Sequence, residues 1–131
     1  MAAEPTPEGP FREAFPIIQA SDIDRLIAFY TDGLGFEVGY RFPPDGPIDY
    51  AFLKLSPLGI GIGRRPDGTA EPPANRGWEL WIYADDVDTA VESVSRLGAS
   101  VLEPPADQPW GERVALVADP EGNRIHIGAR G

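Results

Sequence analysis

The sequence predicts an α+β fold in which one domain is built from two βαβββ modules. The strongest indication is an internal repeat, because ASDIDRLIAFYTDGLGFEV from Ala20 aligns with ADDVDTAVESVSRLGASVL from Ala84. One strand-like stretch precedes each copy, and three follow its helix. A module of this size covers one face of its sheet with its helix, so the other face must pack elsewhere or line a cleft.

The first module is expected over about residues 14–64. Its helix begins at a cap formed by Ser21 or Asp22, and its apolar stripe comprises Ile23, Leu26, Ile27 and Tyr30. Expected strands cover the stretches 14–21, 36–42, 48–56 and 58–65. In the second of these, alternation places one set of side chains on a single face: Phe36, Val38, Tyr40 and Phe42.

The second module is expected over about residues 78–129. Its helix spans 85–99, and its strands are expected at 78–84, as a short strand within 100–108, at 112–119 and at 123–129. A Pro/Gly-rich connection at 65–77 separates the modules. Residues 1–12 contain little that could pack and are expected to form a flexible arm before a domain at 13–131.

Charge and composition exclude several classes of function. The net charge of −10, with GRR at 63–65 as the only basic cluster, argues against nucleic acid as a partner. An acidic surface can concentrate a cationic ligand, and it can also serve solubility alone. Neither a membrane-spanning apolar run nor a signal peptide is present, so a cytoplasmic protein without a membrane partner is expected. The absence of cysteine excludes thiol catalysis and thiolate metal sites.

The order of these motifs resembles the vicinal oxygen chelate superfamily, which includes glyoxalase I, extradiol dioxygenases and bleomycin-resistance proteins. SDIDRLIAFYTDGLGF early and ADPEGNRIHIG late carry the resemblance, which covers about residues 14–129. A QPWG turn, a strand, DP-x-GN and a strand with an apolar-His-apolar triplet are most similar to the bleomycin-resistance type of antibiotic-binding protein. The resemblance implies a homodimer, often with an exchanged N-terminal strand, and clefts built from both modules and both subunits.

Enzymes of that superfamily hold a divalent metal with about four side chains. The resemblance places those positions on Phe15, on Gly61 or Gly63, on Glu79 and on His126. Only Glu79 and His126 could bind a metal, and two ligands are fewer than zinc or iron sites require. Gln19 and Asp49 are substitutes if the register differs by several residues. We therefore expect no cofactor and no catalytic residue, with a divalent metal as the alternative.

Most residues predicted to line the cleft are aromatic. Their large rigid rings offer stacking surfaces that suit a flat conjugated ligand. The register implied by the resemblance turns Glu79, Trp81 and Tyr83 toward the cleft, and the QPWG match puts Trp110 at its rim. Glu79 and His126 could act as an acid–base pair or simply hydrogen-bond each other. The full set of ligand-binding candidates is Trp81, Trp110, His126, Glu79, Tyr83, Tyr40, Phe42, Phe36, Phe52 and Gln108.

The predicted function is non-catalytic binding of an aromatic or cationic natural-product antibiotic. Such a protein would confer self-resistance by sequestering a bleomycin-, mitomycin-, or enediyne/quinone-like molecule. Its partners would be that small molecule and a second copy of the chain. Two alternatives remain open: a metal-dependent lyase or isomerase of the glyoxalase type, and a small-molecule-binding accessory protein of a biosynthetic pathway.

Overall fold

A computed structural model describes Pro10, residues 14–66 and residues 78–130 of the chain. The arm expected over 1–12 and the connection expected over 65–77 fall almost wholly outside these described residues. Within the described part, no helix has the length and apolar character needed to cross a membrane.

Both modules have the predicted βαβββ order. The first contains β1 (Ile17–Ala20), α1 (Ile23–Ala28) with a π-helical continuation at Phe29–Gly33, β2 (Glu37–Phe42), β3 (Tyr50–Leu55) and β4 (Leu58–Arg64). The second contains β5 (Leu80–Tyr83), α2 (Val87–Arg96), β6 (Ser100–Asp107), β7 (Arg113–Ala118) and β8 (Arg124–Ala129).

The two four-stranded sheets repeat one topology. Their strand orders are β1-β4-β3-β2 and β5-β8-β7-β6. In each sheet the first strand pairs in parallel with the fourth strand of its own module, and the remaining pairs are antiparallel. The internal repeat of the sequence is therefore a repeat of structure.

The matched aspartates of the repeat begin the two helices. The Asp22 carboxylate accepts a hydrogen bond of 3.2 Å from the backbone N–H of Arg25, and the Asp86 carboxylate accepts one of 3.1 Å from Thr89. Each satisfies a backbone donor that the helix leaves unpaired in its first turn. The same capping residue thus fixes where the helix starts in both modules.

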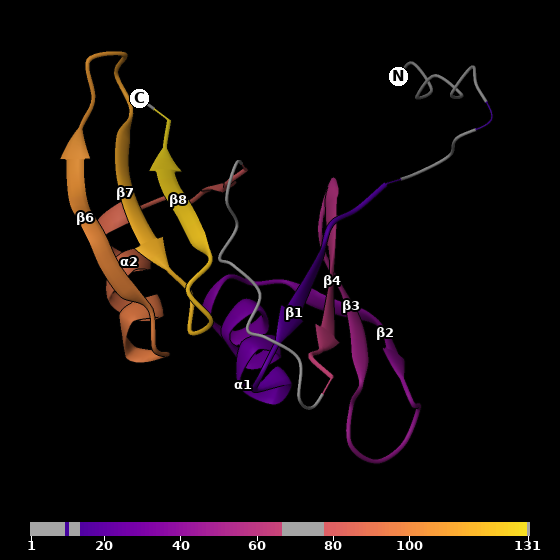
Figure 1. The fold of residues 1–131 in the computed structure, drawn as a ribbon. Coiled ribbons are helices and arrows are strands. Elements are labelled where there is room, and N and C mark those ends of the chain that lie inside the picture. Colours follow the sequence, from indigo (N-terminus) through magenta and orange to yellow (C-terminus); the bar gives the residue numbers. More distant parts are fainter. Residues whose placement is uncertain (1–9, 11–13, 67–77, 131) are drawn as a thin grey trace.

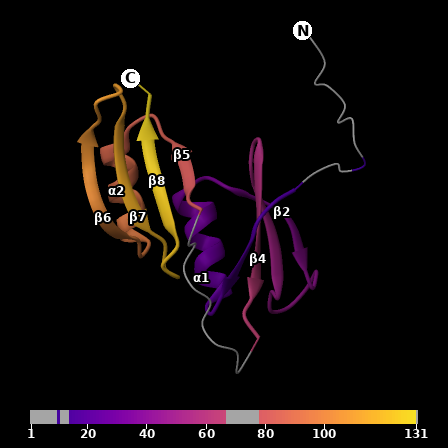
Figure 2. The same ribbon diagram turned by 45° about the horizontal axis from the view of Figure 1, so that its top comes forward.

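One apolar core joins the modules on the helix-bearing faces of their sheets. The two sheets lie on opposite sides of the molecule, with α1 between them, and α2 covers one face of the β5–β8 sheet (Figure 1). The view turned by 45° shows the same arrangement (Figure 2). The other face of each sheet bears no helix, and these are here called the open faces.

The turn ADPEGN ties the second module to the first. Buried Asp119 accepts hydrogen bonds from the backbone N–H groups of Glu121 (2.8 Å) and Asn123 (2.9 Å) and from the Tyr30 hydroxyl (2.8 Å). The Glu121 carboxylate accepts from the backbone N–H and the hydroxyl of Ser21, just before α1. The turn therefore sets the strand register of β7 and β8 and also docks onto the first helix.

Phe36 was predicted on the same face as Tyr40 and Phe42, and this prediction is wrong. It is 3% exposed and packs edge-on against the Tyr30 ring in the core. The pairing of β2 with β3 shifts between Val38 and Tyr40, so an extra residue interrupts the alternation. A bulge of this kind reverses which face the preceding residues occupy.

Candidate functional site

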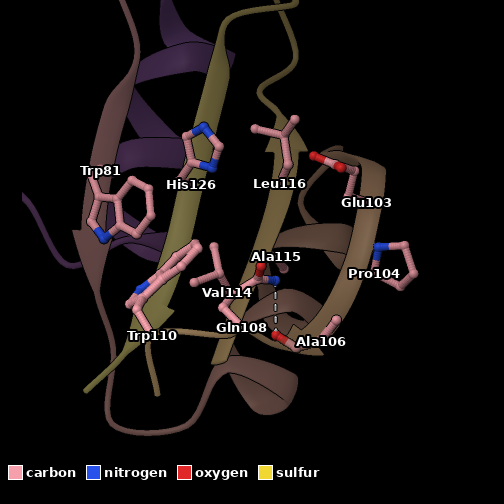
Figure 3. A pocket seen from close by; sticks show the side chains of 10 residues that line it. All are labelled: Trp81, Glu103, Pro104, Ala106, Gln108, Trp110, Val114, Ala115, Leu116 and His126. Carbon is pink, nitrogen blue, oxygen red and sulfur yellow. Dashed lines mark hydrogen bonds between the residues drawn. The ribbon is translucent and has the colours of Figure 1, made fainter. Parts of the chain in front are cut away.

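A pocket of about 380 Å³ lies on the open face of the β5–β8 sheet. Each of the four strands of that sheet contributes at least one side chain to its lining (Figure 3). Its lining residues are Trp81, Glu103, Pro104, Ala106, Gln108, Trp110, Val114, Ala115, Leu116 and His126. Four of the predicted ligand-binding residues therefore meet in one place: Trp81, Gln108, Trp110 and His126.

Two rings form a flat platform at one end of the pocket. Trp81 on β5 and His126 on β8 are direct partners in the parallel ladder, so their side chains share a face. Their ring centroids lie 4.8 Å apart at an interplanar angle of 20°, which is a stacked geometry. The Trp81 side chain remains 41% exposed, so the platform is available to a ligand.

Glu79 holds the histidine in place. Its carboxylate contacts His126 Nε2 directly, and its other oxygen lies 3.9 Å from Arg124 Nε. Glu79 comes just before β5, and a parallel partner strand brings His126 and Arg124 alongside it. Glu79 and His126 therefore contact each other, as both of the alternatives considered from the sequence allow, and the carboxylate orients the imidazole ring.

A tight turn presents Trp110 at the rim. The backbone N–H of Gly111 donates to the carbonyl of Gln108 (3.0 Å), and the N–H of Gln108 donates to the carbonyl of Glu112 (2.7 Å). Gly111 has φ +100°, a conformation that L side chains rarely adopt. The Pro before Trp110 and the Gly after it therefore serve the turn, and the tryptophan is 61% exposed.

Glu112 braces two aromatic side chains. Its carboxylate accepts a hydrogen bond of 2.7 Å from Trp110 Nε1. This bond, followed by one with the Tyr83 hydroxyl, holds the pKa of Glu112 below its usual range, and Glu112 in turn raises the pKa of Tyr83. The Arg130 guanidinium lies 4.0 Å from the centre of the Tyr83 ring. The exposed Trp110 is thus hydrogen-bonded to Glu112 at the rim of the pocket.

The other predicted aromatic residues lie on the open face of the β1–β4 sheet. Tyr40 pairs with Phe52, and Phe42 pairs with Tyr50, across β2 and β3. Glycines in β4 make room for these rings, because a Cβ at Gly61 would lie 2.6 Å from Tyr50 Oη. Tyr40, Phe42 and Phe52 therefore do not line the pocket formed by Trp81, Trp110 and His126 within one chain.

Six residues that line the pocket were not predicted from the sequence: Glu103, Pro104, Ala106, Val114, Ala115 and Leu116. Leu116 was readable, since alternation along β7 puts it on the face of its partner His126. Glu103 was not, because register shifts on both sides of it break the alternation of β6. Glu112, which does not line the pocket but accepts the hydrogen bond from Trp110, was missed as well; its one signal was its position directly after the turn that carries Trp110.

With this geometry in place, comparison with known proteins gives the family. Residues 14–127 match the sequence model described as the Glyoxalase/Bleomycin resistance protein/Dioxygenase superfamily. The chain belongs to this superfamily. An uncharacterized protein of Mycobacterium bovis is 26% identical over 121 residues, covering 86% of this chain and 80% of that protein.

Solved structures of the superfamily type share the fold. TioX from Micromonospora sp. ML1 superposes with a TM-score of 0.70 at 24% identity, over 91% of this chain and 99% of TioX. A glyoxalase-related enzyme from Fulvimarina pelagi gives a TM-score of 0.74 at 19% identity, over 92% of this chain and 89% of that one. At these identities the likeness concerns the fold alone.

Of the four metal positions that the resemblance implies, only two hold donors in this chain. Phe15 and the glycines at 61 and 63 supply no ligand, which leaves Glu79 and His126. Among the described residues, no group of three or more His, Asp or Glu side chains could hold a metal ion. Two donors fall short of the three or four that a zinc site uses, so the residues do not fit the superfamily's metal.

The two substitute donors belong to the other sheet. Gln19 lies in β1, and Asp49 comes just before β3, where its carboxylate is 3.4 Å from Arg64 Nε. Within the described part of the chain, Asp49 forms no group with Glu79 and His126 that could hold a metal ion. Gln19 lies in the β1–β4 sheet, whereas His126 lies in the β5–β8 sheet. What the arrangement offers instead is a rigid aromatic surface with a few polar groups around it.

Proposed function

We propose that this protein binds an aromatic natural-product antibiotic and holds it without changing it chemically. A bleomycin-, mitomycin- or quinone-like compound would be sequestered in the pocket on the β5–β8 sheet, and its host would be protected. The observation that carries the proposal is the pairing of the Trp81–His126 platform with a braced Trp110. Ligand pockets of this kind combine apolar area with a small number of placed polar groups.

The pocket is preorganised for ligand binding. The platform rings already stack on each other, and the turn and Glu112 already fix Trp110. A ligand that binds to such a surface needs to order few side chains. Less conformational entropy is therefore lost on binding. Stacking against an aromatic pair adds roughly 0.5–1.5 kcal/mol beyond the area that it buries.

We further propose that a second copy of the chain completes the cleft. The open face of the β1–β4 sheet leaves Ile17, Tyr40 and Phe42 between 53% and 59% exposed. The pocket lies on the open face of the β5–β8 sheet, where Trp81 is 41% and Trp110 61% exposed (Figure 3). In such a homodimer the open face of the β1–β4 sheet of one chain would pack on the open face of the β5–β8 sheet of the other. Because a two-fold axis repeats this contact, both open faces of both chains would be covered.

Ligand binding is tested by tryptophan fluorescence with bleomycin, mitomycin C and the polycyclic quinone daunorubicin. We expect at least one to quench fluorescence, and Trp110→Ala to weaken that binding about tenfold or more. Trp78→Ala is the matched control, since Trp78 is 41% exposed and does not line the pocket. Equal effects of the two substitutions would contradict the proposed site.

Mass spectrometry of the released compound tests the absence of chemistry. After prolonged incubation and denaturation, the proposal expects the intact molecule in stoichiometric amount. Recovery of a modified product, in amounts exceeding the protein, would overturn sequestration and favour an enzyme of the glyoxalase type.

A further inference from the structure

We infer that the pocket selects a planar aromatic ligand that carries a positive charge, and that the Glu103 carboxylate recognises this charge. The inference rests on the proposed function and narrows it to one ligand class. Among the described residues that line the pocket, Glu103 is the one with a charged carboxylate, and no lysine or arginine is present. An anionic ligand would therefore meet only like charge there.

Glu103 stands at the end of a row that crosses the whole sheet. Trp81 on β5 pairs with His126 on β8, His126 pairs with Leu116 on β7, and Leu116 pairs with Glu103 on β6. Directly paired residues share a face, so the row runs from an aromatic platform over an apolar middle to a carboxylate. Figure 3 shows these four side chains in that order.

The row gives the ligand a length. Three strand spacings of about 4.8 Å separate the first and last residues by roughly 14 Å. A two- or three-ring system on the platform leaves a gap of a few bonds before Glu103. The ligand that fits best has a fused ring system and a cationic group on a short arm, rather than a charge within the rings.

The Glu103 carboxylate is available, unlike its neighbours. Within the described part of the chain, no ion pair or side-chain hydrogen bond involves it. Glu79 is engaged by His126 and Arg124, and Glu112 by Trp110. Glu103 also turns toward Leu116 across the pocket, so a cation bound there would lie beside apolar surface (Figure 3).

The test uses three 1,8-naphthalimides that differ only in the arm on the imide nitrogen. One arm ends in trimethylammonium, the second in the tert-butyl group that has the same shape without charge, and the third in carboxylate. Binding is followed by tryptophan quenching and by naphthalimide anisotropy. We expect the trimethylammonium probe to bind up to about fivefold more tightly than the tert-butyl probe, which is the upper end of what one exposed charge pair contributes.

Two substitutions at Glu103 make the test specific. Glu103→Gln should bring the two affinities to within about a factor of two, and Glu103→Lys should turn the preference toward the carboxylate probe. Glu92→Gln removes the same charge from the exposed surface of α2 and should leave the preference unchanged. Because Glu103 is itself exposed, none of these variants is expected to unfold the chain.

The outcomes separate the inference from the proposed function. Probes that bind through Trp110 but without preference for the cation would overturn the role of Glu103 and leave sequestration of aromatic compounds standing. A preference that persists in Glu103→Gln would do the same. Failure of all three probes to bind would contradict the proposed function as well.

Discussion

At the scale of single residues, Tyr30 and Asp119 hold the two modules together. The Tyr30 hydroxyl donates 2.8 Å to the Asp119 carboxylate, and both groups are buried. Burial, followed by the charge and the hydrogen bond of Asp119, raises the pKa of Tyr30 well above its ordinary value. The fold therefore favours the protonated phenol more than the unfolded chain does.

Tyr30→Phe should lower the free energy of unfolding by about 1–3 kcal/mol at pH 7. The ring contacts with Phe29 and Phe36 survive in this variant, so the loss reports the hydrogen bond. Below pH 10 both the folded and the unfolded chain keep the proton, and the contribution is complete. Above about pH 10 the unfolded chain loses it first, so the difference between wild type and variant should shrink. Urea unfolding measured across this range would contradict the assignment if the difference stayed constant.

Glu112 is the residue that fixes the ligand-facing tryptophan, and its ionisation should be visible at Trp110. With its pKa lowered by the bonds from Trp110 and Tyr83, Glu112 stays charged until the pH falls below the ordinary glutamate value near 4.3. The indole N–H resonance of Trp110 should hold steady above that pH and move as the pH falls below it. Glu112→Gln should abolish the movement, with the indole signals of Trp78 and Trp81 as internal references. A Trp110 signal that titrates identically in the variant would contradict the brace.

At the scale of elements, the turn between β6 and β7 converts a sequence motif into a rigid binding group. Gly111→Ala should cost about 1–2 kcal/mol of stability, because its φ of +100° is unfavourable for an L side chain. Gly46→Ala is a close control: Gly46 has φ +83°, and at both glycines a new Cβ would have nothing within 4 Å. Both variants should lose similar stability by thermal unfolding. Only Gly111→Ala should weaken ligand binding, and equal affinities would show that the turn does not position Trp110.

The elements also show which parts of the site the sequence could predict. Regular periodicity predicted the helix and strand order of both modules. The register implied by the resemblance turned Trp81 toward the cleft, and only the structure shows that Trp81 pairs directly with His126. The wrong or incomplete predictions concern strands in which the pairing with the neighbouring strand is irregular. The bulge in β2 sent Phe36 into the core, and β6 runs from Ser100 to Asp107 straight through Pro104, although only a short strand was expected. An edge strand tolerates proline because its outer N–H groups need no partner.

At the scale of the whole molecule, each sheet has an open face that no helix or strand among the described residues covers. One face carries the pocket, and the other exposes a group of large apolar side chains that a soluble monomer would rarely leave uncovered. The single core already uses the helix-bearing faces of both sheets, so the chain has no further element among its described residues to cover them. We infer that a second copy of the chain covers both open faces.

We therefore predict a homodimer in solution whose stability depends on the β1–β4 face. Light scattering at micromolar concentration should give twice the chain mass of 14.2 kDa.

Phe42→Glu should weaken dimerisation about tenfold or more, because Phe42 is 53% exposed in the single chain and a charge there could not be buried. Leu97→Glu is the control, because Leu97 is 37% exposed at the C-terminal end of α2, on the helix-bearing side of the β5–β8 sheet. If the dimer completes the cleft, Phe42→Glu should also weaken ligand binding at low protein concentration and recover as concentration rises. If the wild-type protein is monomeric and its affinity for the ligand does not depend on protein concentration, the shared cleft is contradicted. The pocket would then be the binding site of a single chain.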